Sequence, residues 1–454
     1  MNRHAVDPPS GQTKITRNQR QQIISACLGT FVEWFDWSLF GLFAIYFSGQ
    51  FFPAEDRLLS MLGAGITFAI AFVFRPVGGW ILGLLADRRG RRPALIIAMV
   101  MMTAGSFMIA LIPSFATIGI AAPVLLIMAR VIQGISAGGD STNVYVYMAE
   151  VAPPGWRNRY SAFTYIFSGG AFLVASLVGL ATTTLLDEAA MQSFGWRIAF
   201  LLGGALGVYG IFARLRLDES EEFTEEVQRA EQLDDRAGNP LWSTLRNYPK
   251  AVALVFGFTM MMTLLYYALT VSFTTYAVEN QGMNEQSVYL VTTLGTAIFV
   301  ALHYPLGKLA DKYGRRPQML VAAAVLAVGI VPATHLVGQS PLGLFFLFTL
   351  CMSVYAPLSA VAPVVYADLF PTSIRGTGLG TWYNIAVALF GGTVSLVLTG
   401  FTALGHADWF FFYVAVAAAV GLVSVLCMRF LKTDPTFRDL GLDEKHAAQK
   451  ELVS

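Results

Sequence analysis

The chain has 454 residues, of which 55% are hydrophobic and 13% are charged, whereas an average soluble domain carries roughly 25% charged residues. So little charge excludes a water-soluble fold, and a net charge of +1 provides no basic surplus for binding nucleic acid. Cys27, Cys351 and Cys427 stand singly in apolar stretches, which predicts neither disulfides nor a metal site, and we expect no cofactor.

Twelve apolar runs follow one another along the chain. Each has about the 20 residues that a helix needs to cross a bilayer with its backbone groups paired internally. They predict an all-α membrane protein with spans at 24–47, 62–86, 93–113, 119–148, 159–186, 195–216, 250–278, 287–310, 318–337, 341–367, 377–401 and 408–431. The first run is longer than a signal-peptide core, so we expect it to be retained.

The loop charges predict the orientation. Twelve spans put both termini on one side, and if that side is the cytoplasm, 26 of the 30 Lys and Arg residues lie there. The sequence therefore predicts a multi-pass protein of the bacterial inner (plasma) membrane with both termini in the cytoplasm. We expect a monomer that contacts membrane lipid and has no nucleic-acid partner.

A hydrophilic segment rich in Glu, Asp and Arg separates the sixth run from the seventh and divides the chain into similar halves. We expect a cytoplasmic N-terminal segment at 1–23, a six-helix bundle at 24–216, a cytoplasmic linker at 217–249, a second six-helix bundle at 250–431 and a cytoplasmic tail at 432–454.

Two loop motifs occur once in each half. The stretch 83–93, GLLADRRGRRP, recurs at 307–317 as GKLADKYGRRP, and the pattern of Glu150, Pro153 and Arg157 recurs 218 positions later. Repeats of this kind are typical of transporters in which two bundles rotate about a central site.

The chemistry of the repeated motifs suits a turn at the membrane surface. Glycine permits a tight turn, arginines anchor it among headgroups, and the aspartate can accept backbone N–H groups at a helix N-terminus. The motifs are either topology anchors alone or also a cytoplasmic gate whose ion pairs break when the halves separate. The gate candidates are Gly83, Asp87, Gly90, Arg91, Glu150, Arg157, Asp311, Arg315, Asp368 and Arg375.

The first motif and its copy resemble the signature loops of the major facilitator superfamily. Val32–Asp36, Arg75–Gly79 and the pattern from Arg130 to Gly134 resemble the metabolite:proton symporter family within it. That family includes permeases for α-ketoglutarate, citrate, shikimate, and proline or betaine, and the N-terminal half looks most similar to the α-ketoglutarate permeases. The resemblance covers nearly the whole chain and implies a symporter, not an enzyme, that imports a small carboxylate with protons by alternating access.

Five ionisable residues fall inside predicted spans of the first half, where a charge needs a partner or a watery cavity. Counted from the cytoplasmic helix ends, Asp36 and Arg75 lie roughly 17 to 18 Å deep. Glu33 and Asp140 lie roughly 12 to 14 Å deep, and Arg130 roughly 27 Å deep. Helices one, two and four are thus expected to direct these groups at a common interior.

Two roles are open for each of these groups. The carboxylates Glu33, Asp36 and Asp140 are candidates for proton coupling, and the arginines Arg75 and Arg130 for binding a substrate carboxylate. Alternatively, the arginines only neutralise the carboxylates. Tyr165, Tyr266 and Tyr267 are weaker candidates for lining a substrate cavity, and His303 is interpreted as a packed residue in preference to a proton relay.

Other functions remain open alternatives. A permease for a zwitterionic or neutral metabolite such as betaine, proline or shikimate fits the same pattern, and a non-transporting receptor is a further alternative. No Ser/His/Asp constellation, HExxH or phosphate-binding glycine loop indicates an enzyme. Asp140 stands where the family usually has Glu, which puts the geometry of its partner in doubt.

Overall fold

The computed structural model describes residues 15–53, 57–153, 155–219, 224, 240–273, 277–278, 281–335, 340–406 and 408–431. Residues 1–14, most of the expected linker at 217–249 and the whole expected tail at 432–454 lie outside this part of the chain.

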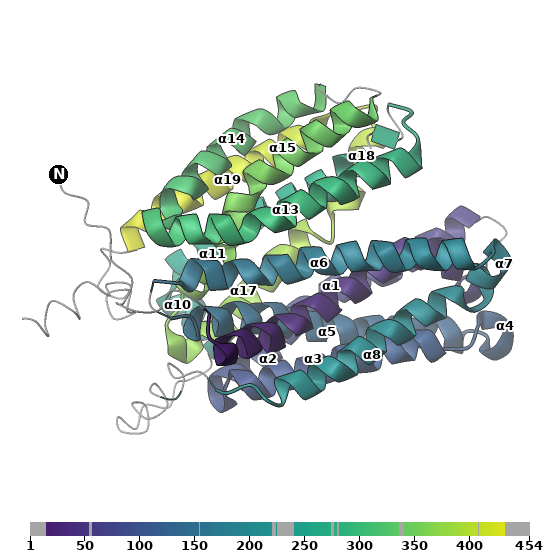
Figure 1. The fold of residues 1–454 in the computed structure, drawn as a ribbon, viewed down its shortest axis with the longest axis horizontal. Helices are drawn as coiled ribbons and strands as arrows, with labels where there is room; N and C mark the ends of the chain where they lie inside the picture. The colour runs from purple at the N-terminus through teal and green to yellow at the C-terminus, as the bar shows by residue number, and fades with distance from the viewer. Residues whose placement is uncertain are drawn as a thin grey trace, which may run out of the picture.

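Figure 1 shows two groups of long helices lying side by side. The first bundle comprises α1 (Arg17–Phe51), α2 (Arg57–Arg89), α3 (Arg91–Leu111), α4 (Phe115–Ile118), α5 (Ala121–Glu150), α6 (Arg157–Leu185), α7 (Glu188–Ala190), η1 (Met191–Gly195) and α8 (Trp196–Arg214). The second bundle comprises α11 (Pro249–Tyr267), η2 (Ala268–Ser272), α13 (Glu285–Tyr313), α14 (Arg315–His335), α15 (Pro341–Ser359), α16 (Ala362–Ala367), η3 (Thr372–Ile374), α17 (Arg375–Phe390), α18 (Val394–Ala403) and α19 (Trp409–Leu431), preceded by α10 (Pro240–Asn247).

Eleven helices in the described residues are long and apolar enough to cross a membrane. The span expected at 377–401 is instead divided into α17 and α18 by a turn at 391–393. Gly391 and Gly392 begin this turn, and both of their N–H groups donate to the carbonyl of Val387, so the regular hydrogen-bond ladder ends there. Consecutive glycines lower the cost of leaving the helix at this point.

The first helix begins seven residues before the expected start at 24. Thr16 caps α1: its side chain accepts the N–H of Gln19, whose own side chain accepts the N–H of Thr16. The first two turns of α1 consist mainly of polar residues that precede the apolar run. A search by hydropathy alone therefore could not assign them to the helix. The earlier start adds about 10 Å to every depth counted along α1.

The two ends of the molecule differ. We call the end that carries the turns 88–92 and 312–316 the motif end, and the end that carries α4 and α7 the far end (Figure 1). The turns at the motif end require Gly90 and Gly314, whose φ angles are 102° and 86°. Residues with a Cβ rarely adopt this region.

The most extensive contacts between the bundles join α2 with α17 and α6 with α13, and α5 also contacts α16 and α17. Glycines let α2 and α17 approach closely: a Cβ on Gly79 would lie 1.9 Å from the carbonyl oxygen of Gly380, and one on Gly83 would lie 2.5 Å from that of Gly376. Small residues at such a crossing let the backbones approach closely, and the resulting van der Waals packing is one of the forces that associate helices in lipid. We call the whole contact surface between the two bundles the seam.

Candidate functional site

Asp87 crosses the seam and caps a helix of the other bundle. Its carboxylate accepts the N–H groups of Gly376 at 2.8 Å and Thr377 at 2.7 Å, in the first turn of α17. It also pairs with Arg91 at 2.7 Å. A carboxylate at this position satisfies unpaired amides and meets the positive end of the helix dipole.

Asp311, the repeat of Asp87, does the same in the opposite direction. It accepts the N–H groups of Asn158 at 2.9 Å and Arg159 at 3.4 Å, in the first turn of α6, and pairs with the Arg159 side chain at 2.6 Å. Each repeated loop therefore caps a helix that belongs to the other bundle.

The second repeated motif supplies two matching ion-pair clusters beside these caps. In one, Glu150 accepts Arg91 of its own bundle at 3.2 Å and Arg375 of the second bundle at 2.8 Å. Arg91 also reaches the carbonyl of Thr372 at 3.0 Å. Both Glu150 and Arg91 are buried, so these charges depend on each other for compensation.

The other cluster is centred on Asp368, which pairs with Arg315 of its own bundle at 2.5 Å and with Arg157 of the first bundle at 2.9 Å. Burial alone would raise the pKa of Asp368, but Arg157 and Arg315 outweigh it and lower the pKa to about 2. This cluster therefore stays charged throughout the neutral range. All the predicted gate residues lie in the helix caps, turns, seam and clusters of the motif end.

Asp36 lies inside the first bundle, paired with Arg130. Arg130 Nη1 is 3.6 Å from Asp36 Oδ2, and Ser106 and Gln133 each donate to the Asp36 carboxylate at 2.6 Å. Arg130 also donates to Gln133 at 2.8 Å. Its Nε and Nη2 are buried, and neither donates to any of the described residues, so Arg130 has hydrogen-bonding capacity left for another partner.

Glu33 pairs with Arg75 at the seam. Arg75 Nη2 lies 3.3 Å from Glu33 Oε1, while Ser141 donates to Glu33 at 2.8 Å. On its other side, Arg75 Nε donates at 3.3 Å to Asn384 of α17. Asn384 also donates at 2.6 Å to the carbonyl of Gly138. Arg75 thus connects a buried carboxylate to a helix of the second bundle.

Asp140 is paired with Arg214, the last residue of α8. The two side chains meet through two hydrogen bonds, one of them at 3.1 Å. Arg214 also donates to the carbonyls of Leu95 at 2.6 Å and Ala26 at 3.0 Å, and its guanidinium fills the space beside Gly29. This cluster joins α1, α3, α5 and α8 within one bundle.

These pairings correct the depths expected from the sequence, which grouped Asp36 with Arg75 and set Arg130 about 10 Å deeper. Counted from Arg17, the true start of α1, Asp36 is about 28 Å from the motif end, and Arg130 is about 30 Å from it along α5. The two residues are therefore level. Inside the first bundle the structure pairs Asp36 with Arg130, Glu33 with Arg75, and Asp140 with Arg214.

The predicted tyrosines lie along the seam. Tyr165 stacks on His303 of α13 with ring centroids 5.6 Å apart, and Tyr266 meets Trp34 edge-on at 5.6 Å. Tyr267 contacts Phe72 at 6.3 Å. Both ring nitrogens of His303 have partners, the Phe299 carbonyl at 2.8 Å and the Ser359 hydroxyl at 2.9 Å, which favours the packed interpretation of this residue.

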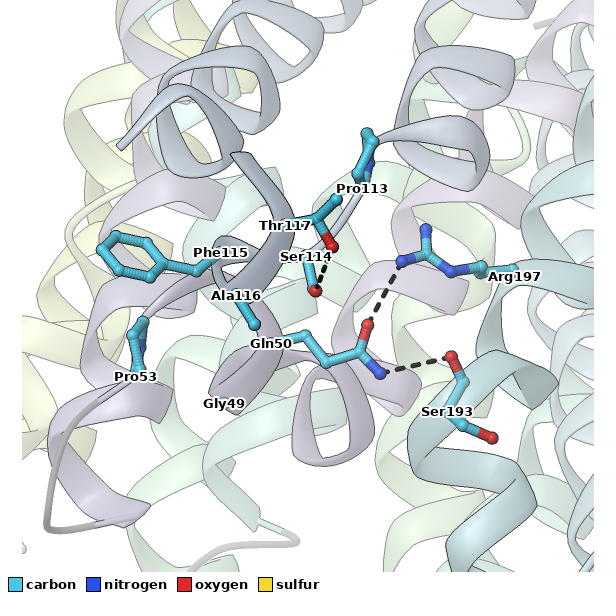
Figure 2. Close-up of a pocket in the computed structure, with 10 residues that line it drawn as sticks. All are labelled: Gly49, Gln50, Pro53, Pro113, Ser114, Phe115, Ala116, Thr117, Ser193 and Arg197. Atoms are coloured by element: carbon cyan, nitrogen blue, oxygen red, sulfur yellow. Dashed lines mark hydrogen bonds between the residues drawn. The ribbon is translucent and has the colours of Figure 1, made fainter. Parts of the chain in front are cut away.

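A hollow of about 590 Å³ lies at the far end of the first bundle (Figure 2). Arg197 reaches into its wall, donating to the carbonyls of Ala110 at 3.0 Å and Ile112 at 2.7 Å and to Gln50 at 3.2 Å. These contacts occupy the guanidinium and satisfy carbonyl groups at the C-terminal end of α3. They explain the presence of a charged Arg197 at this position as a structural contact. The hollow contains no predicted site residue.

Sequence reasoning missed several residues of these clusters. Arg214 was counted among the cytoplasmic loop charges, and its place inside the sixth apolar run was the available signal. Trp37, Ser106, Ser141 and Asn384 are neutral, so no charge in an apolar run distinguished them. Only the helix pairing across the seam reveals Asn384 as a partner of Arg75.

The chain is similar to known transport proteins over nearly its whole length. The family model "Sugar (and other) transporter" matches residues 22–238, and "Major Facilitator Superfamily" matches residues 259–453. The α-ketoglutarate permease of Escherichia coli K12 is 33% identical over 91% of this chain and 95% of that protein. The proline/betaine transporter of the same organism is 30% identical over 90% of this chain and 83% of that protein.

Among solved structures, the proton:xylose symporter XylE, bound to 6-bromo-6-deoxy-D-glucose, is similar with a TM-score of 0.77. It is 17% identical, and the match covers 92% of this chain and 96% of that one. This likeness concerns the fold: twelve spanning helices in two six-helix bundles, with the twelfth span of this chain accounted for by α17 and α18.

Proposed function

This chain belongs to the major facilitator superfamily, and we propose that it imports a small carboxylate metabolite, such as α-ketoglutarate, together with protons. It is a membrane transport protein and not an enzyme. The observation that carries the proposal is the Glu33–Arg75 pair, a buried carboxylate and guanidinium held at the seam and in contact with both bundles.

We assign the motif end to the cytoplasm of a bacterial cell, with both termini on that side of the inner membrane. The support is the distribution of Lys and Arg, which gather in the loops of this end. The caps and ion-pair clusters around Asp87, Asp311, Glu150 and Asp368 then hold the cytoplasmic entrance closed in this conformation. Their separation, as the bundles 24–216 and 250–431 rotate, opens it.

Proton coupling is assigned to Glu33 and Asp36. Each carboxylate accepts several hydrogen bonds and faces one arginine, so taking up a proton releases that arginine from its ion pair. Asp140 is assigned to packing, because Arg214 binds it through two bonds and is itself fixed by two backbone carbonyls of the same bundle. A residue held in this way has no second partner to exchange with.

Arg75 is assigned to the substrate carboxylate. Its Nη1 donates to no described residue, and protonation of Glu33 would free Nη2 as well, which makes the planar fork available. A negatively charged substrate then replaces Glu33 as the counter-charge of Arg75. Proton and substrate would bind together for this reason. Arg130, with two unused donors, is a second candidate for a carboxylate.

One observation favours a zwitterionic substrate as the alternative. Every Lys and Arg whose side chain is described in the second bundle lies toward the motif end. Near Arg75 this bundle contributes the neutral amide of Asn384 and the rings of Tyr266, Tyr267 and Tyr383. Aromatic rings accommodate an alkylammonium group better than a second carboxylate. The proline/betaine transporter among the relatives is consistent with this alternative.

The test is uptake by purified protein in proteoliposomes, with and without an inward proton gradient. We expect accumulation of labelled α-ketoglutarate only with the gradient, and competition by unlabelled succinate and glycine betaine decides between the two substrate classes. Absence of gradient-driven uptake for every compound would refute proton-coupled import.

Two variants assign the roles. Asp36→Asn should abolish accumulation but keep exchange of labelled for unlabelled substrate, because exchange needs no net proton movement. Arg75→Lys should weaken apparent affinity about 10- to 150-fold, since lysine cannot form the two-pronged contact, worth about 1.5 to 3 kcal/mol. Glu188→Gln and Arg88→Lys, at exposed positions, are the matched controls. Unchanged exchange affinity in Arg75→Lys would remove Arg75 from the binding site.

A further inference from the structure

Proton uptake by Glu33 or Asp36 breaks an ion pair and removes the counter-charge of its arginine. When either carboxylate becomes neutral before substrate arrives, its arginine remains as a buried cation without a counter-charge. An uncompensated buried charge is strongly destabilising. Some other group must therefore hold the guanidinium during that step.

Aromatic rings surround the guanidinium of Arg130. The carbon Cζ lies 4.2 Å from the ring centroid of Phe40, 4.9 Å from that of Trp37 and 5.3 Å from that of Phe68. A cation within about 6 Å of a ring face is attracted by the ring's quadrupole, most strongly for tryptophan. This attraction persists when Asp36 is protonated, and it is then strongest, because a ring face that attracts the cation also repels the neighbouring carboxylate charge.

Arg75 shares one of these rings. Its Cζ lies 5.4 Å from the Trp37 ring centroid and 5.8 Å from that of Phe72. Trp37 is buried and fixed edge-on against Phe72 at 4.6 Å and Phe68 at 5.0 Å. It is thus the one ring among the described contacts that touches the arginines of both ion pairs, and it follows Asp36 directly in α1.

We propose that Trp37 is a positioning residue: it is the neutral partner that keeps Arg75 and Arg130 in place while Glu33 and Asp36 are protonated. This proposal rests on the proposed function. With the ring present, part of the stabilisation of each cation survives the loss of its carboxylate, so protonation costs less. The arginine also stays where the substrate carboxylate can meet it.

The surroundings leave the carboxylates as the groups that titrate. The charged and titratable groups in the region of Trp37 come from five other helices as well as from α1. They are Glu33 and Asp36 from α1, Arg75 from α2, Arg130 and Asp140 from α5, Arg214 from α8, Tyr267 from α11 and Tyr383 from α17. Arginine and tyrosine do not ordinarily change charge between pH 5 and 8. The pH dependence of uptake therefore reports on the protonation of Glu33 and Asp36 and on the contacts of Arg75 and Arg130, including the contact with Trp37.

Removing the ring makes each arginine depend more on its carboxylate, so the carboxylate gives up its negative charge less readily. The external pH at which uptake is half-maximal should then move toward acid. If the contact differs between the two protonation states by the strength of one ordinary cation–π contact, the shift is about 0.4 to 1.5 pH units.

The experiment measures initial uptake against external pH in proteoliposomes that contain equal amounts of folded protein. We expect Trp37→Met to shift the midpoint toward acid, Trp37→Phe to restore most of the wild-type midpoint because it keeps a ring, and exchange to persist in both. Trp37→Leu is a second ring-free variant should Trp37→Met fail to fold. Trp80→Met, at a half-exposed tryptophan of α2, is the matched control.

Two results would overturn the role of Trp37. One is a ring-free variant with the wild-type midpoint, and the other is Trp37→Phe shifting as far as Trp37→Met, which would indicate packing alone. Wild-type uptake that ignores external pH would instead refute proton coupling itself, and with it the role of Trp37. The two failures are thus distinguishable from the wild-type profile.

Discussion

Exchanging Asp87 or Asp311 for Asn should open the motif end, because each carboxylate stabilises only the closed arrangement. Each accepts two backbone N–H groups of a helix in the other bundle, whereas an Asn side chain offers one accepting oxygen. In the open arrangement water replaces these contacts for both residue types. The substitution therefore acts on the equilibrium between the two arrangements.

The hydrogen bonds of these carboxylates determine how far each substitution changes the closed-to-open ratio. Both carboxylates are nearly enclosed, with side chains 4% and 3% exposed for Asp87 and Asp311, so solvent screening is weak. Losing one hydrogen bond to a charged acceptor costs about 1.5 to 3 kcal/mol, which is about 10- to 150-fold in the closed-to-open ratio. The two residues cap different helices and have no partner in common among the described residues, so the effects of the double variant should multiply.

Spin-label distances measure the ratio directly. In a protein without native cysteines, labels at Arg89→Cys and Lys312→Cys report the separation of exposed positions on opposite bundles at the motif end. We expect a longer distance to gain population in each single variant and to dominate in the double variant. Asp218→Asn, an exposed residue at the same end, is the control. A double variant no more open than either single variant would refute independent capping across the seam.

Two further predictions follow from the ion pairs. Because its pKa is depressed from 3.8 to about 2, Asp368 stabilises the closed end fully above about pH 4 and loses this effect only as pH falls through 2. The difference in closed population between wild type and Asp368→Asn should therefore be constant from pH 8 to 5, and a difference that shrinks toward pH 5 would contradict this. Arg214→Met should cost about 3 to 5 kcal/mol by leaving Asp140 unpaired, and adding Asp140→Leu should recover most of the loss in apparent melting temperature. Additive losses in the double variant would argue against a coupled pair.

The sequence was sufficient for the helices and for the motif end. Hydropathy located the spans, although α1 begins seven residues before its expected start and the span at 377–401 is divided. The repeated motifs identified residues that form the caps and clusters, since loop charges that recur at similar shifts in both halves occupy equivalent places. The aspartate's expected bond to helix amides is confirmed for both copies. The proposed gate role of this network stays a prediction.

The pairing of charges inside the first bundle could not be predicted in the same way. It depends on where α1 begins, and the polar turn from Arg17 onward is invisible to a search for apolar runs. In the sequence, an arginine at a helix end, such as Arg214, cannot be distinguished from the loop arginines that indicate the cytoplasmic side. Asn384 and Trp37 contact Arg75 from segments far away in the chain, and spacing along one helix does not reveal such contacts.

The turn at 391–393 has a mechanical consequence for the second bundle. On one side of it, α17 is held against α2 by the Gly79–Gly380 contact and by the Asp87 cap. On the other side, α18 contacts α19 and η2 of its own bundle. Because the helix is interrupted at 391–393, no continuous helix transmits bending between the two pieces, and a displacement of α18 need not pull α17 away from α2.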